Sequence, residues 1–522
     1  MTKWLLSALA LCFSLTYASH DLPAKQVAII GAGAAGSSTA YSLRNAINDA
    51  TPLNITVFER APYVGGRSTT VNVLDNPAYP VELGASIFVN VNYNLVNATR
   101  DLGLSVQSAS YERPKESPDQ IGVWDGEQFV FVLQDTYSWW NVAKLIWRYG
   151  WAPVRTQSLM KRTVQSFLRL YDAPLFPFAS LSAAAEAIGL LDATAAPGQS
   201  FLSDNGVAAD FARDVIQAST RVNYGQNLPL IHGLEAMVCM ATDGAMAVSG
   251  GNWQIFDRML RASRADVHLN HTVTAIRRSA ADDDDSWIVA VDTPSGRASY
   301  VFDEVVIAGP LQYTDIQITP GLAQPPDEIP FVTLHVTLFA SPHRLSPQYF
   351  HTTQPVPETV LTTLPRDTDL GSSKKGVGPA GFWSISTLRT VDMVMDDGRV
   401  EQQYVYKIFS PERVTASFVR DILGLNSTAA SDAAAIGDLP THDISWSHEK
   451  TWRPYPFLYP RVTFEEPVLA PGLWYTGGIE SFISTMETSA LMGKNIAALM
   501  AQSWPGQDEV SLGDDPVDRT EL

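Results

Sequence analysis

Glycines near the start of the chain have the spacing of a phosphate-binding turn. Gly31, Gly33 and Gly36 directly follow the apolar run 26–30, with Ala34 and Ala35 between them. Glycine at these positions permits a tight turn and lets the backbone approach a pyrophosphate. The helix that follows would point its first N–H groups at that anion. The spacing therefore predicts a strand–turn–helix unit that binds a dinucleotide.

An acidic residue and a second glycine turn indicate which dinucleotide binds. Glu59 ends the next apolar run and is followed by Arg60, at the distance where a carboxylate accepts hydrogen bonds from an adenosine ribose. A carboxylate there would repel a 2′-phosphate, which argues against NADP. Gly65, Gly66 and Arg67 add a second phosphate-contacting turn with a cation. These features predict FAD; the alternative is a glycine-rich turn with no ligand.

Charge and the N-terminal residues limit the class of protein. The chain has 522 residues and a formal net charge of −19, so a nucleic-acid backbone would repel it. Residues 4–15 are apolar and precede small residues, so we expect a cleaved signal peptide over residues 1–18. The alternative is an ordinary N-terminal strand or helix. Cys239 is then the one cysteine of the mature chain, and its apolar neighbours predict a buried, inert thiol.

Four N-x-S/T triplets support a secretory destination, whether secreted, vacuolar or lysosomal. The predicted glycosylation sites are Asn54, Asn97, Asn270 and Asn426. Asn54 and Asn270 stand at the starts of predicted strands, so we expect those two to be the less accessible ones. We see no metal-ligand spacing among the histidines, nor in the aspartate run 282–285.

Strand and helix patterns alternate between two kinds of segment. Residues 121–133 have the pattern of a hairpin with its turn at Asp125 and Gly126, residues 221–227 that of a polar loop, and residues 267–307 that of a strand meander followed by a buried strand. Nucleotide-binding patterns occur in three separated stretches, so we expect an α/β protein in which an FAD-binding Rossmann-like domain is interleaved with an α+β substrate domain. The flavin would lie between the two lobes. The expected boundaries are FAD-binding segments 24–105, 236–312 and 446–504, a largely helical substrate segment 106–235, a second substrate segment 313–445, and an acidic disordered tail 505–522.

A basic amphipathic stretch covers residues 137–171, which contain no acidic residue. It has helical periodicity and is rich in tryptophan. We favour a helical cap over the substrate cavity; the alternative is a face that rests on a membrane surface. Its tryptophans and cations are Trp139, Trp140, Trp147, Trp151, Lys144, Arg148, Arg155, Lys161, Arg162 and Arg169.

Three segments carry a resemblance to a known family. They are residues 82–87, residues 221–226 with 245–252, and residues 478–499. In this order they resemble the glutathione-reductase-type FAD fold of the amine-oxidase superfamily and, within it, the prenylcysteine oxidase (prenylcysteine lyase) family. The resemblance covers nearly the whole mature chain. Its central and C-terminal segments are more specific than the nucleotide motifs, which many flavoproteins share.

The resemblance implies roles for particular residues. Gly31, Gly33 and Gly36 would hold the pyrophosphate, Glu59 the ribose, and Arg67 the phosphates. Backbone groups of Val273 would meet adenine, and Gly478 and Glu480 the ribityl chain; Glu480 departs from the aspartate of amine oxidases. The final helix, starting near Thr485, would direct its dipole at the flavin edge. The expected cofactor-binding residues are Gly31, Gly33, Ala34, Ala35, Gly36, Glu59, Arg60, Gly66, Arg67, Gly84, Ala85, Val273, Gly478 and Glu480.

The activity implied by the resemblance is oxidation of an S-prenylcysteine thioether. Hydride leaves the allylic carbon, water adds, and prenyl aldehyde and cysteine are released while molecular oxygen becomes hydrogen peroxide. The expected partners are therefore a hydrophobic prenylated small molecule and oxygen. Phe88, Trp139, Trp140, Trp147 and Phe167 are candidates to line the prenyl pocket, or they form ordinary core. Candidate catalytic residues are Asn223, Tyr224 and Gln226, whose alternative role is to satisfy a buried loop.

Three other functions stay open at this point. The same fold could oxidise the prenyl chain of a terpenoid or meroterpenoid in secondary metabolism, or form a cyclic ether from it. A polyamine or amino-acid oxidase is disfavoured by Glu480. A secreted flavoprotein-like binding module with no activity is the third.

Overall fold

A mostly parallel six-stranded sheet forms the part of the chain that contains the glycine motif. The computed structural model describes residues 24–47, 51–108, 120–134, 139–280, 285–366, 368, 373, 375–394, 398–425 and 434–504. The sheet order is β20-β21-β13-β1-β2-β9, and β20 alone in it runs antiparallel. Its strands are β1 (Lys25–Ile30), β2 (Leu53–Glu59), β9 (Asp266–Leu269), β13 (Glu304–Ile307), β20 (Val468–Ala470) and β21 (Leu473–Tyr475).

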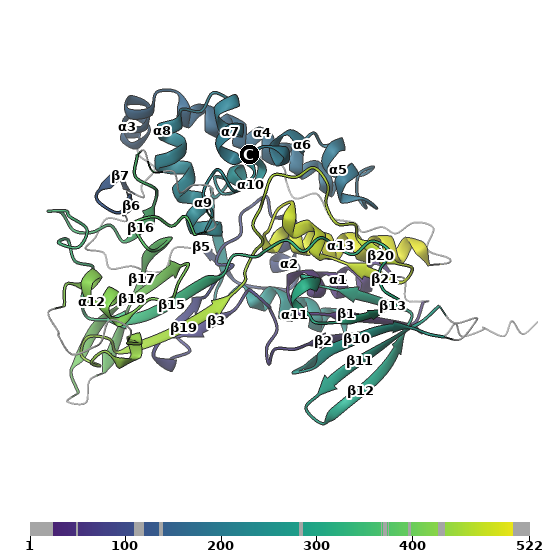
Figure 1. The fold of residues 1–522 in the computed structure, drawn as a ribbon. Coiled ribbons are helices and arrows are strands. Elements are labelled where there is room, and N and C mark those ends of the chain that lie inside the picture. The colour runs from purple at the N-terminus through teal and green to yellow at the C-terminus, as the bar shows by residue number, and fades with distance from the viewer. Residues whose placement is uncertain are drawn as a thin grey trace, which may run out of the picture.

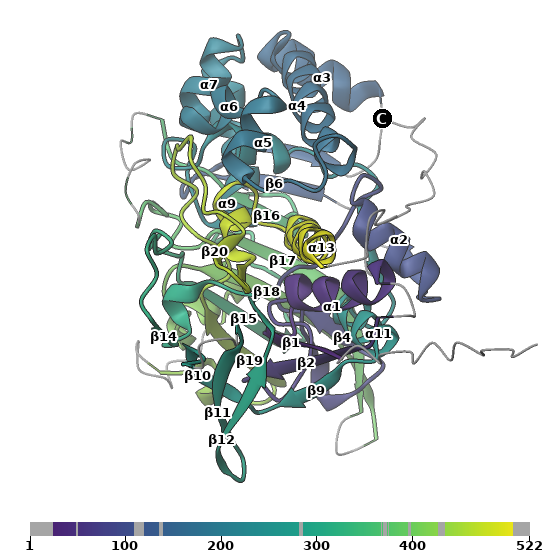
Figure 2. The same cartoon turned by 90° about the vertical axis from the view of Figure 1, so that its right-hand side faces the viewer.

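The central strands are short apolar runs because both of their faces are covered. Val27, Ala28 and Ile29 of β1 are fully buried. Helices α1 (Ala34–Ala46) and α13 (Met486–Ser503) lie against each other beside this sheet (Figure 2). Gly493 makes their close approach feasible, since a Cβ there would lie 2.3 Å from the Ala35 carbonyl oxygen. Helices α2 (Tyr93–Asp101) and α11 (Trp253–Ser263) complete this lobe.

A second sheet extends from the first and carries the predicted meander. Its order is β12-β11-β10-β14, formed by β10 (Thr272–Arg278), β11 (Trp287–Thr293), β12 (Gly296–Phe302) and β14 (Gln317–Thr319). The fully buried Ile276, Val289 and Val291 pack with the sheet residue Phe58. The strand and hairpin patterns expected over residues 267–307 are confirmed.

The seven-stranded sheet of the other lobe is largely antiparallel and combines distant parts of the chain (Figure 1). The hairpin predicted over residues 121–133 is confirmed and forms one edge of this sheet. The sheet order is β19-β15-β18-β17-β16-β6-β7, with β6 (Gln120–Trp124), β7 (Phe129–Gln134), β15 (Leu334–Ser341), β16 (Thr359–Thr362), β17 (Ser384–Val394), β18 (Val400–Ser410) and β19 (Trp446–Trp452). Helix α12 (Ala416–Leu423) packs beside it.

Helices gather at one end of the molecule, above both lobes, in Figures 1 and 2. The predicted amphipathic stretch forms α3 (Trp139–Tyr149) and α4 (Ala152–Leu168). The remaining members are α5 (Leu181–Ala187), α6 (Leu191–Ala195), α7 (Gly198–Asp204), α8 (Ala209–Phe211), α9 (Gln217–Tyr224) and α10 (Gly233–Val238). The short strands β3 (Thr70–Asn72), β4 (Pro80–Glu82), β5 (Val106–Ser108) and β8 (Met246–Val248) form two small two-stranded sheets.

One sequence-based expectation about these helices is wrong. Residues 221–227 are polar and were expected to form a loop, but Arg221 to Tyr224 are the last turn of α9, which ends at Gly225 in the left-handed region (φ 58°). Arg221 tolerates full burial because it donates hydrogen bonds to Thr362, Asn227 and two backbone carbonyls. Polar composition did not reveal this because the partners lie far away in sequence.

Interleaving of the two lobes is visible in the order of the strands. The six-stranded sheet takes strands from residues 25–59, 266–307 and 468–475. The seven-stranded sheet takes strands from residues 120–134 and 334–452. The α/β class and the Rossmann-like unit predicted from the sequence are confirmed. The individual domain boundaries remain predictions, and the expected signal peptide and acidic tail lie outside the described residues.

Candidate functional site

A cavity of about 1320 Å³ runs between the lobes. Ile30, Glu59 and Ile307 line it from the carboxyl ends of three neighbouring parallel strands, the edge where open α/β sheets bind their ligands. Val164 and Phe167 of α4 and Phe409 of β18 line it from the other side. Its volume exceeds that of an ordinary small-ligand pocket, so it has room for a dinucleotide and a substrate together.

The glycine turn leaves the start of α1 open to this cavity. Its N-cap, Gly33, has no side chain to cap the helix, and the first turn contains no acidic residue. Ala34 and Ala35 line the cavity. The first N–H groups of a helix lack partners within the helix, so this end attracts an anion such as a pyrophosphate.

Glu59 is held in place beside that turn. Its carboxylate accepts hydrogen bonds from the Ala32 N–H at 2.9 Å and from the Ala61 N–H at 2.7 Å. The residue is buried, with 8% of its surface exposed, yet it lines the cavity. A carboxylate fixed in this way has acceptor capacity left for the hydroxyl groups of a ribose.

Close contact between two turns explains the second glycine pair. A Cβ on Gly66 would lie 3.3 Å from the Gly33 Cα, so the two turns approach across their glycines. Gly31 has a positive φ, and a Cβ there would lie 2.8 Å from the Ala308 carbonyl oxygen. A Cβ on Gly36 would lie 2.0 Å from the Gly31 carbonyl oxygen. These positions form a backbone cradle that fits the pyrophosphate of FAD.

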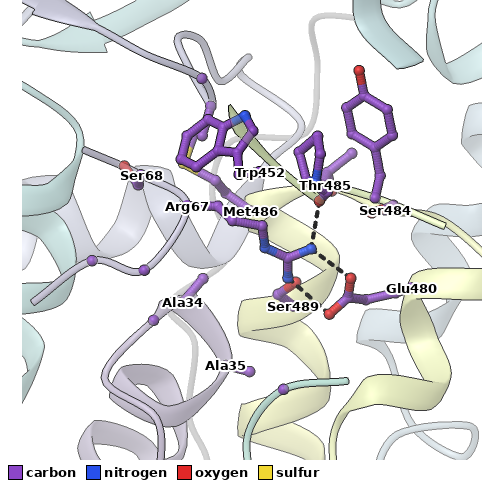
Figure 3. A pocket seen from close by; sticks show the side chains of 18 of the residues that line it. Ala34, Ala35, Arg67, Ser68, Trp452, Glu480, Ser484, Thr485, Met486 and Ser489 are labelled. Carbon is purple, nitrogen blue, oxygen red and sulfur yellow. Dashed lines mark hydrogen bonds and ion pairs between the residues drawn. The ribbon is translucent and has the colours of Figure 1, made fainter. Parts of the chain in front are cut away.

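Arg67 and Glu480 form a bidentate ion pair at the cavity wall (Figure 3). The Arg67 guanidinium donates to the two carboxylate oxygens of Glu480 at 2.6 and 2.8 Å, and also to the Pro454 carbonyl oxygen at 2.6 Å. Both residues line the cavity, so the pair joins two cofactor-binding segments predicted from opposite ends of the chain. In this structure Arg67 is therefore engaged by a carboxylate, whereas the sequence placed it beside the phosphates alone.

The start of α13 forms another part of the wall. Thr485 is its N-cap and accepts a hydrogen bond from the Thr488 N–H at 3.1 Å. Thr485, Met486 and Ser489 line the cavity, and Figure 3 shows them near the Arg67–Glu480 pair. The helix begins at Met486, next to the predicted start near Thr485. Because its first residues line the cavity, its positive end is directed toward the cavity.

Most predicted cofactor residues line the cavity, and two lie just behind its wall. The residues in contact with it are Gly31, Gly33, Ala34, Ala35, Glu59, Arg60, Gly66, Arg67, Gly84, Ala85, Val273 and Glu480. Gly36 and Gly478 are not among the lining residues. A Cβ at Gly478 would lie 2.2 Å from the Glu465 carbonyl oxygen. Glycine is therefore needed at this position for close packing of the backbone.

Two of the three candidate catalytic residues line the cavity, and the third is buried outside it. Asn223 and Tyr224 line the cavity, and the Tyr224 hydroxyl donates to the Ser484 carbonyl oxygen at 3.0 Å. Gln226 is fully buried outside the lining, where its amide bonds the backbone of Tyr224, Pro456 and Leu458. The hydrogen bonds of the Gln226 side chain are thus all to backbone, as its alternative, structural role requires.

Buried titratable groups missed by sequence reasoning surround this region. Lys407 lines the cavity, and burial lowers its pKa to about 8. Burial raises the pKa of Glu82 to about 7 and that of Glu235, behind Tyr224, to about 8. Glu82 begins the segment 82–87 that carries the family resemblance, but no motif or spacing indicates a shifted pKa for any of the three residues. The burial created by the fold does.

Several peripheral predictions can be compared with the structure. Asn54 and Asn270 are exposed, contrary to expectation, whereas Asn97 is buried, with 8% of its surface exposed. Asn426 lies outside the described residues. Cys239 is buried and free, as expected, and burial raises its pKa. Phe88 and Phe167 line the cavity, but Trp147 is 91% exposed and does not. The side chains of Trp139 and Trp140 lie outside the described residues.

The described residues contain neither a metal site nor a helix that could span a membrane. No group of three or more histidine, cysteine, aspartate or glutamate side chains there is arranged to hold a metal ion. Within the same residues, every helix is too short or too polar to cross a bilayer.

Solved structures of similar fold define the general class. Cyclohexylamine oxidase from Brevibacterium oxydans superimposes with a TM-score of 0.54 at 18% identity, over 92% of this chain and 99% of that one. Residues 29–101 match the sequence model of an NAD(P)-binding Rossmann-like domain. The chain therefore shares the fold of this amine oxidase.

Sequence comparison is more specific. Residues 132–514 match the sequence model of the prenylcysteine lyase family. Farnesylcysteine lyase of Arabidopsis thaliana is 30% identical, over 95% of this chain and 91% of that protein. Prenylcysteine oxidase 1 of Bos taurus is 30% identical, over 96% and 93%. The chain belongs to the prenylcysteine lyase family and is an FAD-dependent oxidoreductase.

Proposed function

We propose that this protein is an FAD-dependent oxidase that cleaves the thioether of S-prenylcysteine. The reaction consumes the thioether, water and O2, and it yields a prenyl aldehyde, cysteine and H2O2. The allylic carbon is oxidised by two electrons and O2 is reduced by two, so the equation balances. The observation that carries the proposal is a single cavity lined by the Glu59 and Gly33 half-site at one side and apolar side chains at the other.

Bound FAD would supply a two-electron acceptor that O2 reoxidises. Gly31, Gly33 and Gly66 would hold its pyrophosphate on backbone, and Glu59 its ribose hydroxyls. Glu480, with Arg67 as its partner, would contact the polar chain that joins pyrophosphate and ring. The N-terminal end of α13, which Thr485 caps, would stabilise negative charge that develops at the ring edge.

Apolar residues on the opposite side suit a prenyl chain. Phe88, Val164, Phe167, Leu388 and Phe409 all line the cavity. Each buried CH2 contributes about 0.8 kcal/mol, so a farnesyl chain would supply most of the binding free energy. The names of the relatives favour a prenylcysteine over the terpenoid or meroterpenoid substrate considered above.

Turnover of a defined substrate tests the proposal. The FAD-loaded protein should convert S-farnesylcysteine into farnesal and free cysteine, with one H2O2 formed per aldehyde. S-dodecylcysteine is the matched control because its saturated chain has no allylic hydrogen, and it should give neither product. A yellow, folded preparation that leaves S-farnesylcysteine unchanged but oxidises a prenylated terpenoid would refute the assignment in favour of the alternative.

We further propose that the protein enters the secretory pathway and meets its substrate at a lipid surface. The apolar N-terminal run supports the first statement, and exposed Asn54 and Asn270 are open to glycosylation. Trp147 and Trp151 are 91% and 66% exposed beside the cations of α3 and α4, which supports the second. Val164 and Phe167, on the same helix pair, line the cavity, so a docked α4 would place the cavity next to the lipid.

A further inference from the structure

Lys407 is a buried cation at the cavity for which neither cofactor nor fold supplies a role. It lies on β18 with 9% of its surface exposed. Its Nζ donates to the Glu82 carbonyl oxygen at 3.1 Å and to the Ser86 hydroxyl at 3.3 Å. It also lies 5.2 Å from the ring centroid of Phe409, another lining residue.

Both acceptors of Lys407 are neutral. An ammonium group has three N–H donors, so one is left over. Among the described residues, the Lys407 Nζ donates to no carboxylate oxygen. The charge of the nearby Glu82 carboxylate favours the protonated lysine, but that carboxylate accepts its hydrogen bond from the Asn252 N–H at 2.6 Å, and burial still lowers the pKa of Lys407. A positive charge removed from water and only partly compensated in this way would be stabilised by an anion in the cavity.

Other cations at the cavity are less suited to an incoming anion. Arg67 is paired with Glu480. Arg60 and Arg453 are exposed to water, and Lys450 is less buried than Lys407, so water weakens any attraction these three cations exert. Lys407 is distinguished by its burial and its spare donor.

Strand pairing places hydroxyl groups next to this cation. Ser386 of β17 is the direct cross-strand partner of Lys407, and Ser384 is the partner of Phe409. Both serines line the cavity. An ammonium flanked by hydroxyl donors is a set of groups that binds a carboxylate, whose two oxygens accept several hydrogen bonds.

We propose that Lys407, assisted by Ser386, binds the α-carboxylate of an S-alkylated amino acid, with the alkyl chain along the apolar wall. The inference deepens the function proposed above and depends on it for the choice of ligand. It makes Lys407 a determinant of specificity for the free acid. Esters and amides, which lack the negative charge, would bind less tightly at this position.

Equilibrium binding of a ligand that cannot react tests this assignment. S-octylcysteine and its methyl ester are titrated into the FAD-loaded protein by calorimetry, for the native chain and for Lys407→Met. The native protein should bind the acid about tenfold or more tightly than the ester, the size expected of a charge-assisted hydrogen bond. Lys407→Met should lose that preference by weakening the acid alone.

Lys450→Met is the matched control, since it removes the other lysine in contact with the cavity. It should keep the preference for the acid. Flavin content and thermal midpoint show whether Lys407→Met is folded, and if it is not, the comparison of acid and ester on the native chain still decides. Equal binding of acid and ester by the native protein overturns the assignment. Because the ligand is saturated, this result is independent of whether S-farnesylcysteine is oxidised.

Discussion

At the scale of single residues, glycines form the part of the site that is proposed to bind the cofactor. Gly31, Gly36 and Gly66 each lie where a Cβ would contact backbone. Gly33 differs, because a Cβ there meets nothing closer than the Gly66 Cα at 3.8 Å, and its φ of −86° suits any residue. Gly33 is thus the position where one methyl group would enter the space left for the pyrophosphate without disturbing the fold.

We therefore predict that Gly33→Ala folds but loses flavin. Its affinity for FAD should fall by about tenfold or more, because the methyl group occupies the approach of the anion to the helix start. The bound 450 nm absorbance after desalting measures this. Gly321→Ala is the control, since a Cβ there has nothing within 4 Å and φ is not positive. Full flavin retention by Gly33→Ala would contradict the proposed pyrophosphate position.

At the scale of secondary-structure elements, helices α3 and α4 have two faces with different roles. Leu159 and Met160 of α4 pack in the core, and Val164 and Phe167 of the same helix line the cavity. Trp147, Trp151 and Val154 point to solvent beside the exposed Lys144 and Arg162. The sequence left a cap and a membrane face as alternatives, and this arrangement is compatible with both at once.

A vesicle experiment tests the membrane face. The protein should sediment with vesicles containing anionic lipid and only weakly with zwitterionic ones, because basic and aromatic side chains act together at a lipid interface. Changing Trp147 and Trp151 to alanine should reduce binding to anionic vesicles by about tenfold or more. Val301→Ala removes an exposed apolar side chain on β12 and should leave binding unchanged. Undiminished binding by the double variant would remove α3 and α4 from the interface.

At the scale of the whole molecule, a fully buried carboxyl makes stability depend on pH. Burial raises the pKa of Glu235 to about 8 from an ordinary value of 4.5. Between these values the folded chain holds a proton that the unfolded chain releases. The free energy of unfolding contributed by this group therefore falls as pH rises from about 5 to about 8.

Glu235→Gln should remove that dependence. The variant should gain about 2–4 kcal/mol relative to the native chain between pH 5 and pH 8.5, because each pKa unit corresponds to about 1.4 kcal/mol. Urea unfolding at the two pH values measures the difference. Glu328→Gln changes an exposed carboxyl and should shift neither value. A gain that is equal at both pH values would show that Glu235 is ionised in the folded protein.

The features that could be predicted from the sequence are those that depend on residues close together in the chain. The βα turn at Gly31 to Gly36, Glu59 at the end of β2, the hairpin at Asp125 and the start of the last helix all depend on nearby residues, and all were predicted. Arg67 and Glu480 were both assigned to the cofactor site, but their ion pair joins positions 413 apart. The loop expected at Arg221 was wrong, and the two roles left open for Gln226 were not separated, because the hydrogen-bond partners of both residues come mostly from other strands and loops.

Spacing and residue type alone predicted the α/β class and the dinucleotide turn, because these depend on contacts between neighbours in sequence. Three segments of the sequence carried the resemblance to the family. Only the tertiary structure decided which polar side chains are buried away from solvent. Lys407, Glu82 and Glu235 acquire their shifted pKa values from burial between distant segments, and no local pattern records that burial.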